Sequence, residues 1–142
     1  MEKRILIIDD DEAVRDTYKD YLTHFLKDKI SKIITPCIIE RPYTENYLLK
    51  KELLSYIKEQ LKKGLNFIII DGGFIDEFIS LVEDNKLSVQ DFLGIKTYLS
   101  SGYNTPSFYN KEITFLKSIG LDITFCGKLD YMCIINDIMA KL

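Results

Sequence analysis

Short apolar runs alternate along the chain with longer segments in which apolar residues recur at helical spacing. The runs are rich in β-branched residues, which is typical of strands buried on both faces of a sheet. They predict strands at 4–8, 32–39, 67–70, 95–99 and 123–126. The longer segments predict helices at 12–26, 45–63, 74–84, 106–118 and 130–141. This alternation indicates a parallel sheet covered by helices on both faces, and Pro36 suits an edge position for the second strand.

The composition narrows the class of protein. A length of 142 residues fits one domain spanning 1–142, and 46% hydrophobic with 29% charged residues is typical of an ordinary globular protein. The 19 basic and 22 acidic residues give a net charge of −3, so we expect no direct nucleic-acid binding. No apolar run approaches the roughly 18 residues of a membrane span, and the first run is too short for a signal peptide. We therefore expect a cytoplasmic domain.

The cysteines carry no pattern of a metal site. Cys37, Cys126 and Cys133 are odd in number and lack the Cys-x-x-Cys spacing. An odd count without that spacing favours reduced thiols in a cytosolic protein over a disulfide framework. We expect all three thiols to be reduced.

Polar residues follow four of the predicted strands. Asp9 and Asp10 come after the first strand, Asp71 after the third, Ser100 after the fourth and Lys128 after the fifth. Ligands of open parallel sheets bind at the carboxyl ends of the strands, beside the point where the strand order reverses. With the strand order 2-1-3-4-5, the first and third strands are neighbours. The three aspartates should then converge.

Three converging carboxylates repel one another, so something must offset that repulsion. Each pair at about 4 Å costs about 4 kcal/mol at an effective dielectric constant near 20, so shared protons or a divalent cation must offset the repulsion. Mg²⁺ fits, because it needs only one or two carboxylates beside its waters and a phosphate oxygen. Lys128 and Ser100 would supply a positive charge and a hydroxyl donor to a phosphoryl group, and an Asp can accept one as an acyl phosphate. Taken singly, each residue could instead be a helix cap, a turn residue or a solvated lysine.

Four segments together carry a family resemblance. The segments 4–15, 67–71, 98–102 and 125–128 resemble, in this order, the acidic pair, phosphoacceptor, hydroxyl and lysine strands of bacterial response-regulator receiver domains. The resemblance covers nearly the whole chain. It implies a flavodoxin-like, doubly wound α/β fold with a five-stranded parallel sheet in the order 2-1-3-4-5.

The resemblance also implies roles for individual residues. Asp71 would accept a phosphoryl group from a sensor histidine kinase or phosphotransfer protein. Asp9, Asp10, Asp71 and the backbone carbonyl of Gly73 would hold Mg²⁺. Ser100 and Lys128 would contact the phosphoryl group. The switch residues would be Ser100 and the aromatic Phe125, and Ser101 would be the small residue that gates access to the acyl phosphate.

As a receiver, the chain would be a switch that acts on a downstream protein target. It would not be an enzyme beyond its own phosphorylation and dephosphorylation. Homodimer formation is a further expectation from the family. For Phe125, plain core packing is an equal alternative.

The chain departs from the receiver pattern in its longer spacings from Asp10 to Asp71 and from Ser100 to Lys128, and at two places beside the site. The loop after Asp71 begins with Gly72-Gly73 and lacks the Met-Pro that receiver domains usually have there. We therefore expect this loop to be more flexible than in other receivers. Leu129 replaces the proline that usually follows the lysine. Because a cis bond before a non-proline residue costs about 2.5–4 kcal/mol, we predict a trans Lys128–Leu129 peptide.

Two other functions remain open at the level of sequence. The departures favour a degenerate receiver that binds a protein partner without phosphorylation. The Asp9-x-Asp11 pattern after a buried strand partly fits a haloacid-dehalogenase-type phosphohydrolase, in which Asp9 would be the nucleophile. The missing later acidic pair and cap domain argue against that enzyme.

Overall fold

The strands of the computed structural model form one parallel sheet. The structure describes residues 3–26, 33–39, 46–102, 106–127 and 130–142. Within these ranges the five strands are ordered β2-β1-β3-β4-β5, and every neighbouring pair is parallel. The predicted strand order is therefore confirmed, with β2 at an edge. The strands are β1 (Lys3–Ile8), β2 (Ile33–Ile39), β3 (Phe67–Asp71), β4 (Lys96–Ser101) and β5 (Asp122–Gly127).

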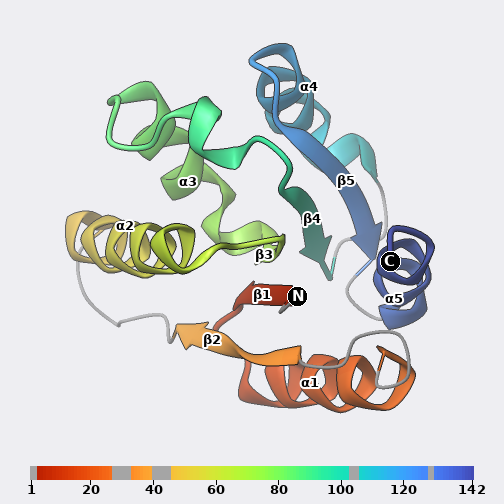
Figure 1. Cartoon of the computed structure of the whole chain (residues 1–142). Helices are drawn as coiled ribbons and strands as arrows, with labels where there is room; N and C mark the ends of the chain where they lie inside the picture. The colour runs from red at the N-terminus through yellow and green to blue at the C-terminus, as the bar shows by residue number, and fades with distance from the viewer. Residues whose placement is uncertain (1–2, 27–32, 40–45, 103–105, 128–129) are drawn as a thin grey trace.

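Helices cover both faces of the sheet (Figure 1). One face carries α1 (Glu12–Leu26) and α5 (Tyr131–Ala140), which lie side by side. The other face carries α2 (Asn46–Lys63), α3 (Ile75–Glu83) and α4 (Asn110–Ser118). Among the described residues, no helix combines the length and hydropathy needed to cross a lipid bilayer.

The apolar core is divided between the two faces. Successive side chains of a strand point to opposite faces, so β3 contributes Phe67 and Ile69 to the core under α1 and α5, and Ile68 and Ile70 to the core under α2, α3 and α4. All four side chains are buried. Burial on both faces explains why β3 reads as a continuous apolar run rather than an alternating one.

Short 3₁₀ turns precede α3 and α4, which begin one and four residues later than the sequence pattern predicts. Gly72–Phe74 forms a 3₁₀ turn ahead of α3, and Pro106–Tyr109 forms another ahead of α4. A third 3₁₀ turn, Val89–Phe92, lies between α3 and β4, and its Ser88 hydroxyl accepts a hydrogen bond from the Gln90 amide. Periodicity does not resolve such short turns, because they present too few residues to define a face.

Candidate functional site

The three predicted aspartates meet at the carboxyl edge of the sheet. In the register of β1 and β3, Ile8 lies beside Ile70, so Asp9 and Asp71 leave adjacent strands at the same level. One carboxylate oxygen from each of Asp9, Asp10 and Asp71 lies within 4.8 Å of the other two. The strand order brings these residues together, as the sequence analysis predicts.

Asp9 is the deepest of the three. It is 2% exposed, and its Oδ1 accepts a hydrogen bond of 2.8 Å from the Asp11 amide. Its backbone carbonyl accepts a second hydrogen bond, of 2.9 Å, from the Nη1 of Arg15, which is itself buried. These contacts fix Asp9 in one orientation at the base of the cluster.

The other two carboxylates are more accessible. Asp10 is exposed and Asp71 is half-buried, with its Oδ2 accepting a hydrogen bond of 3.2 Å from the Gly73 amide. An all-oxygen set that is open to solvent on one side suits Mg²⁺, which retains several waters and binds through one or two carboxylates plus a phosphate oxygen. The donor chemistry of the three aspartates therefore fits this ion.

Ser100 lies next to Asp71 but its hydroxyl has a protein partner. Asp71 and Ser100 are register partners in β3 and β4. Ser100 is fully buried, and its Oγ is 2.9 Å from the Tyr18 Oη of α1. Sequence reasoning places Tyr18 only as an apolar-face residue of the first helix. A tyrosine on the buried face of a helix does predict some hydrogen-bond partner for its hydroxyl, because buried tyrosine hydroxyls usually have one.

The neighbouring serine is bonded to a second tyrosine, on the opposite face. The Ser101 Oγ is 2.9 Å from the Oη of Tyr109, which is buried at the end of the 3₁₀ turn before α4. Tyr109 also packs against Gly72, where an added Cβ would lie 2.1 Å from the Tyr109 Oη. Sequence reasoning did not identify Tyr109 as part of this site.

The close approach of Tyr109 gives Gly72 a definite role. The two glycines predict a more flexible loop after Asp71, whereas the structure has a 3₁₀ turn capped by the Asp71 carboxylate, with Gly72 buried inside it. Glycine is required there because any side chain would occupy the space of the tyrosine ring.

Phe125 lies on the same face of the sheet as Tyr109. It is partly buried and packs against the core under α2, α3 and α4, and its ring centroid is 6.1 Å from that of Tyr109. This placement agrees with core packing, and the switch role of Phe125 stays a prediction. The same holds for the Gly73 carbonyl as a metal ligand.

Two predictions fall outside the described residues. These are the phosphoryl-binding role of Lys128 and the trans Lys128–Leu129 peptide. The described part of β5 ends at Gly127, which is paired with Ser101.

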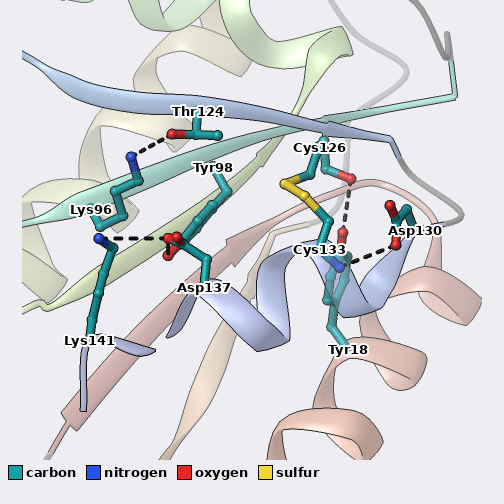
Figure 2. The surroundings of a disulfide bond; sticks show 10 residues. Tyr18, Lys96, Tyr98, Thr124, Cys126, Asp130, Cys133, Asp137 and Lys141 are labelled. Atoms are coloured by element: carbon teal, nitrogen blue, oxygen red, sulfur yellow. Dashed lines mark hydrogen bonds and ion pairs between the residues drawn. A yellow bond between two sulfur atoms is a disulfide. The ribbon is translucent and has the colours of Figure 1, made fainter. Parts of the chain in front are cut away.

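The expectation of reduced thiols is wrong for two of the three cysteines. Cys126 of β5 and Cys133 of α5 form a disulfide, with their Cα atoms 6.1 Å apart (Figure 2). The spacing of seven residues spans a β–α connection, and α5 returns across the face on which Cys126 lies. A search for Cys-x-x-Cys spacing misses a pair that the tertiary fold brings together.

The comparisons with known proteins bear on the fold. No protein-family model matches the chain, and no curated protein sequence matches it. Among solved structures, the chain is similar to the chemotaxis protein CheY4 of Vibrio cholerae, at 16% identity over 100% of both chains and a TM-score of 0.58. It also matches the receiver domain of the histidine kinase CKI1 of Arabidopsis thaliana, at 17% identity over 97% of this chain and 90% of that one. The TM-score of that second match, 0.47, is too low to carry a conclusion.

The likeness to CheY4 and the strand order point to the same architecture. A parallel sheet ordered β2-β1-β3-β4-β5, with α1 and α5 on one face and the other helices on the opposite face, is present over the described residues. The chain has the flavodoxin-like α/β fold of response-regulator receiver domains.

Proposed function

We propose that this chain is a phosphoacceptor receiver domain of two-component signal transduction, in which Asp71 is phosphorylated in the presence of Mg²⁺. The observation that carries the proposal is the meeting of Asp9, Asp10 and Asp71 within 4.8 Å at the carboxyl edge of a receiver-type sheet. That edge is where open parallel sheets bind their ligands.

The burial of the carboxylates favours Asp71 over Asp9 as the nucleophile. Asp9 lies 2% exposed with one oxygen bonded to the Asp11 amide, whereas Asp71 is half-buried and can meet a donor. A carboxylate oxygen of Asp71 would attack the phosphorus, and the bond from phosphorus to the donor's leaving atom would break. Bound Mg²⁺ would neutralise charge on the transferred group. The burial of Asp9 argues against the phosphohydrolase alternative.

The remaining site residues would act on the phosphoryl group after transfer. The Ser100 hydroxyl would exchange its Tyr18 partner for a phosphoryl oxygen, and Lys128 would supply a positive charge to another. Phe125 would respond to the movement of Ser100, and the Gly73 carbonyl would complete the metal ligands. A local charge change would then bias a two-state surface.

The partners follow from this role. The phosphodonor would be a sensor histidine kinase or phosphotransfer protein in the cytoplasm, and the output would be a downstream protein target. Residues 1–142 would form one receiver domain that acts without direct nucleic-acid binding and without enzymatic turnover beyond its own dephosphorylation. Homodimer formation is part of the same proposal.

One observation favours a second candidate, a degenerate receiver that binds a partner without phosphorylation. The Ser100 hydroxyl, which a phosphoryl group would need, is already bonded to Tyr18 in a fully buried setting. In a degenerate receiver that bond would be permanent and the acidic cluster would bind no phosphoryl group.

The test measures phosphoryl uptake from acetyl phosphate with and without Mg²⁺. The matched variants are Asp71→Asn and Asp91→Asn, the latter at an exposed position of the 3₁₀ turn before β4. We expect Mg²⁺-dependent uptake by the wild type and by Asp91→Asn, and none by Asp71→Asn. Unchanged uptake by Asp71→Asn would contradict the proposal, and no uptake by the wild type from any donor would favour the degenerate receiver.

A further inference from the structure

The disulfide joins the end of β5 to the first turn of α5 (Figure 2). Cys126 is 2% exposed, whereas Cys133 is only partly buried. The start of α5 is also held by Asp130, whose carboxylate accepts a hydrogen bond of 3.2 Å from the Cys133 amide. The covalent bond thus adds to a helix start that already has a capping contact.

A short chain of contacts leads from this bond to the hydroxyl beside Asp71. Cys126 is the register partner of Ser100 in β4 and β5. The Ser100 Oγ is bonded to the Tyr18 Oη, and the ring of Tyr18 contacts the ring of Tyr131 edge-on at a centroid distance of 4.8 Å. Tyr131 begins α5, two residues before Cys133. The disulfide therefore links β5 to α5, α5 contacts α1 through Tyr131 and Tyr18, and Tyr18 is bonded to Ser100 of β4.

We propose that Cys126–Cys133 is a reversible thiol–disulfide site that controls how readily the Ser100 hydroxyl leaves Tyr18 for a phosphoryl group on Asp71. This proposal rests on the proposed function of Asp71. In the oxidised form, the bond holds the start of α5 against β5, so Tyr131 keeps Tyr18 in place against Ser100. In the reduced form the covalent bond is gone, while the Asp130 cap and the hydrogen bond from the Asp130 amide to the Gly127 carbonyl remain, and Tyr18 can shift more easily.

The redox step is an ordinary thiol–disulfide exchange with a dithiol. A thiolate of the dithiol attacks the more accessible Cys133 Sγ, forms a mixed disulfide and releases the Cys126 thiolate, which takes a proton. The second thiol of the dithiol then attacks the mixed disulfide and releases Cys133. Two electrons pass to the protein, and the dithiol becomes a cyclic disulfide. A low-molecular-weight disulfide reverses the reaction.

The experiment compares the oxidised and reduced 142-residue chain in buffers of oxidised and reduced dithiothreitol. Alkylation followed by mass spectrometry counts the free thiols, and acetyl phosphate with Mg²⁺ measures the phosphorylated fraction. We expect the reduced form to reach at least a threefold higher phosphorylated fraction at limiting donor. Hydrogen exchange should also be faster in reduced α1 and α5 than in the oxidised form.

Three variants separate the steps of the proposal. Cys133→Ser should behave like the reduced wild type in both buffers. Cys37→Ser, in the edge strand β2, should keep the full redox response. Tyr18→Phe should still form the disulfide but lose most of its effect on phosphorylation, because the hydroxyl that holds Ser100 is gone.

Each outcome is decisive. The proposal is overturned if no Cys126–Cys133 bond forms in the oxidising buffer, or if the bond forms and neither phosphorylation nor hydrogen exchange of α1 changes. If neither redox form takes up a phosphoryl group, the proposed function fails. The redox coupling to α1 is then still decided by hydrogen exchange alone.

Discussion

The paired strands β4 and β5 have very different polar chemistry at their two ends, of which Figure 2 shows Lys96 and Thr124 at the amino end. At the amino end, Lys96 forms an ion pair of 2.7 Å with Asp122 and a hydrogen bond to the hydroxyl of Thr124. At the carboxyl edge, β4 ends beside Asp71, which lies within 4.8 Å of two further carboxylates. One end pairs opposite charges, and the other gathers like charges.

The two ends of the strands differ in whether their charged groups stabilise the fold. An ion pair with one exposed partner contributes at most about 1 kcal/mol, so the amino end is a local structural contact. Two unit charges at the 4.8 Å limit of this cluster would repel by about 3.5 kcal/mol at an effective dielectric constant near 20, before screening by salt. A cluster that costs free energy without a ligand is expected where a cation binds. The predictions below test this contrast.

The largest effect on Mg²⁺ affinity should come from Asp10→Asn. This exposed carboxylate is one of the proposed ligands, so its removal should weaken Mg²⁺ binding about tenfold, about 1.4 kcal/mol, and should relieve part of the repulsion. The free energy of unfolding without Mg²⁺ should rise slightly. Titration calorimetry and urea unfolding measure the two effects. The control is Asp11→Asn, whose exposed side chain caps the Ala13 amide instead. Equal affinities for the two variants would contradict the metal site.

Gly72→Ala should have the largest effect on the free energy of unfolding. The new Cβ would lie 2.1 Å from the Tyr109 Oη, so the buried ring must move, at a cost of about 1–3 kcal/mol. In a double-mutant cycle with Tyr109→Leu, the combined cost in urea unfolding should be less than the sum of the single costs. Gly102→Ala is the control, because no atom lies within 4 Å of its added Cβ. Strict additivity would show that Tyr109 does not pack against Gly72.

Tyr98→Phe tests the polar contacts under α5. The Tyr98 hydroxyl donates a hydrogen bond to Asp137, so its loss should cost about 1 kcal/mol at neutral pH. Burial, and then Asp137, raise the pKa of Tyr98 well above its usual range. The unfolded chain ionises this phenol near pH 10 while the folded chain does not, so wild-type stability should fall above that pH.

Urea unfolding at neutral and alkaline pH checks this expectation. The free energy of unfolding should fall less at alkaline pH in Tyr98→Phe than in the wild type. Tyr21 is exposed, so Tyr21→Phe should show the same fall as the wild type. An identical decline in the wild type and Tyr98→Phe would contradict the raised pKa.

The smallest effect should come from Asp122→Asn at the amino end. Because Asp122 is mostly exposed, breaking its ion pair with Lys96 should cost about 0.5 kcal/mol or less in urea unfolding. Mg²⁺ affinity should stay at the wild-type value. A large change in that affinity would remove the distinction between the two ends of the strands.

The sequence predicts the fold and the acidic cluster because both depend on strong local patterns. The run ending in Asp71 is apolar over its whole buried length, and its polar end marks the edge of the sheet. The partners of the two serines could not be predicted in the same way. Tyr18 and Ser100 are 82 residues apart, and periodicity assigns a face to Tyr18 without saying which group its hydroxyl meets.

The disulfide and Gly72 teach the same lesson about tertiary contacts. The cysteine spacing has no local signature, and the bond exists because α5 packs back against β5. For Gly72, the sequence indicates conformational freedom, whereas the structure requires space for Tyr109. In both cases the packing of another element, α5 on β5 or Tyr109 against Gly72, determines the role of the residue.

Direct mapping of the phosphorylated residue tests the central claim. The chain is treated with acetyl phosphate and Mg²⁺, the acyl phosphate is reduced with borohydride to homoserine, and the peptides are sequenced by mass spectrometry. The account predicts homoserine in place of Asp71, dependent on Mg²⁺. Homoserine in place of Asp9, or at neither position, would contradict it.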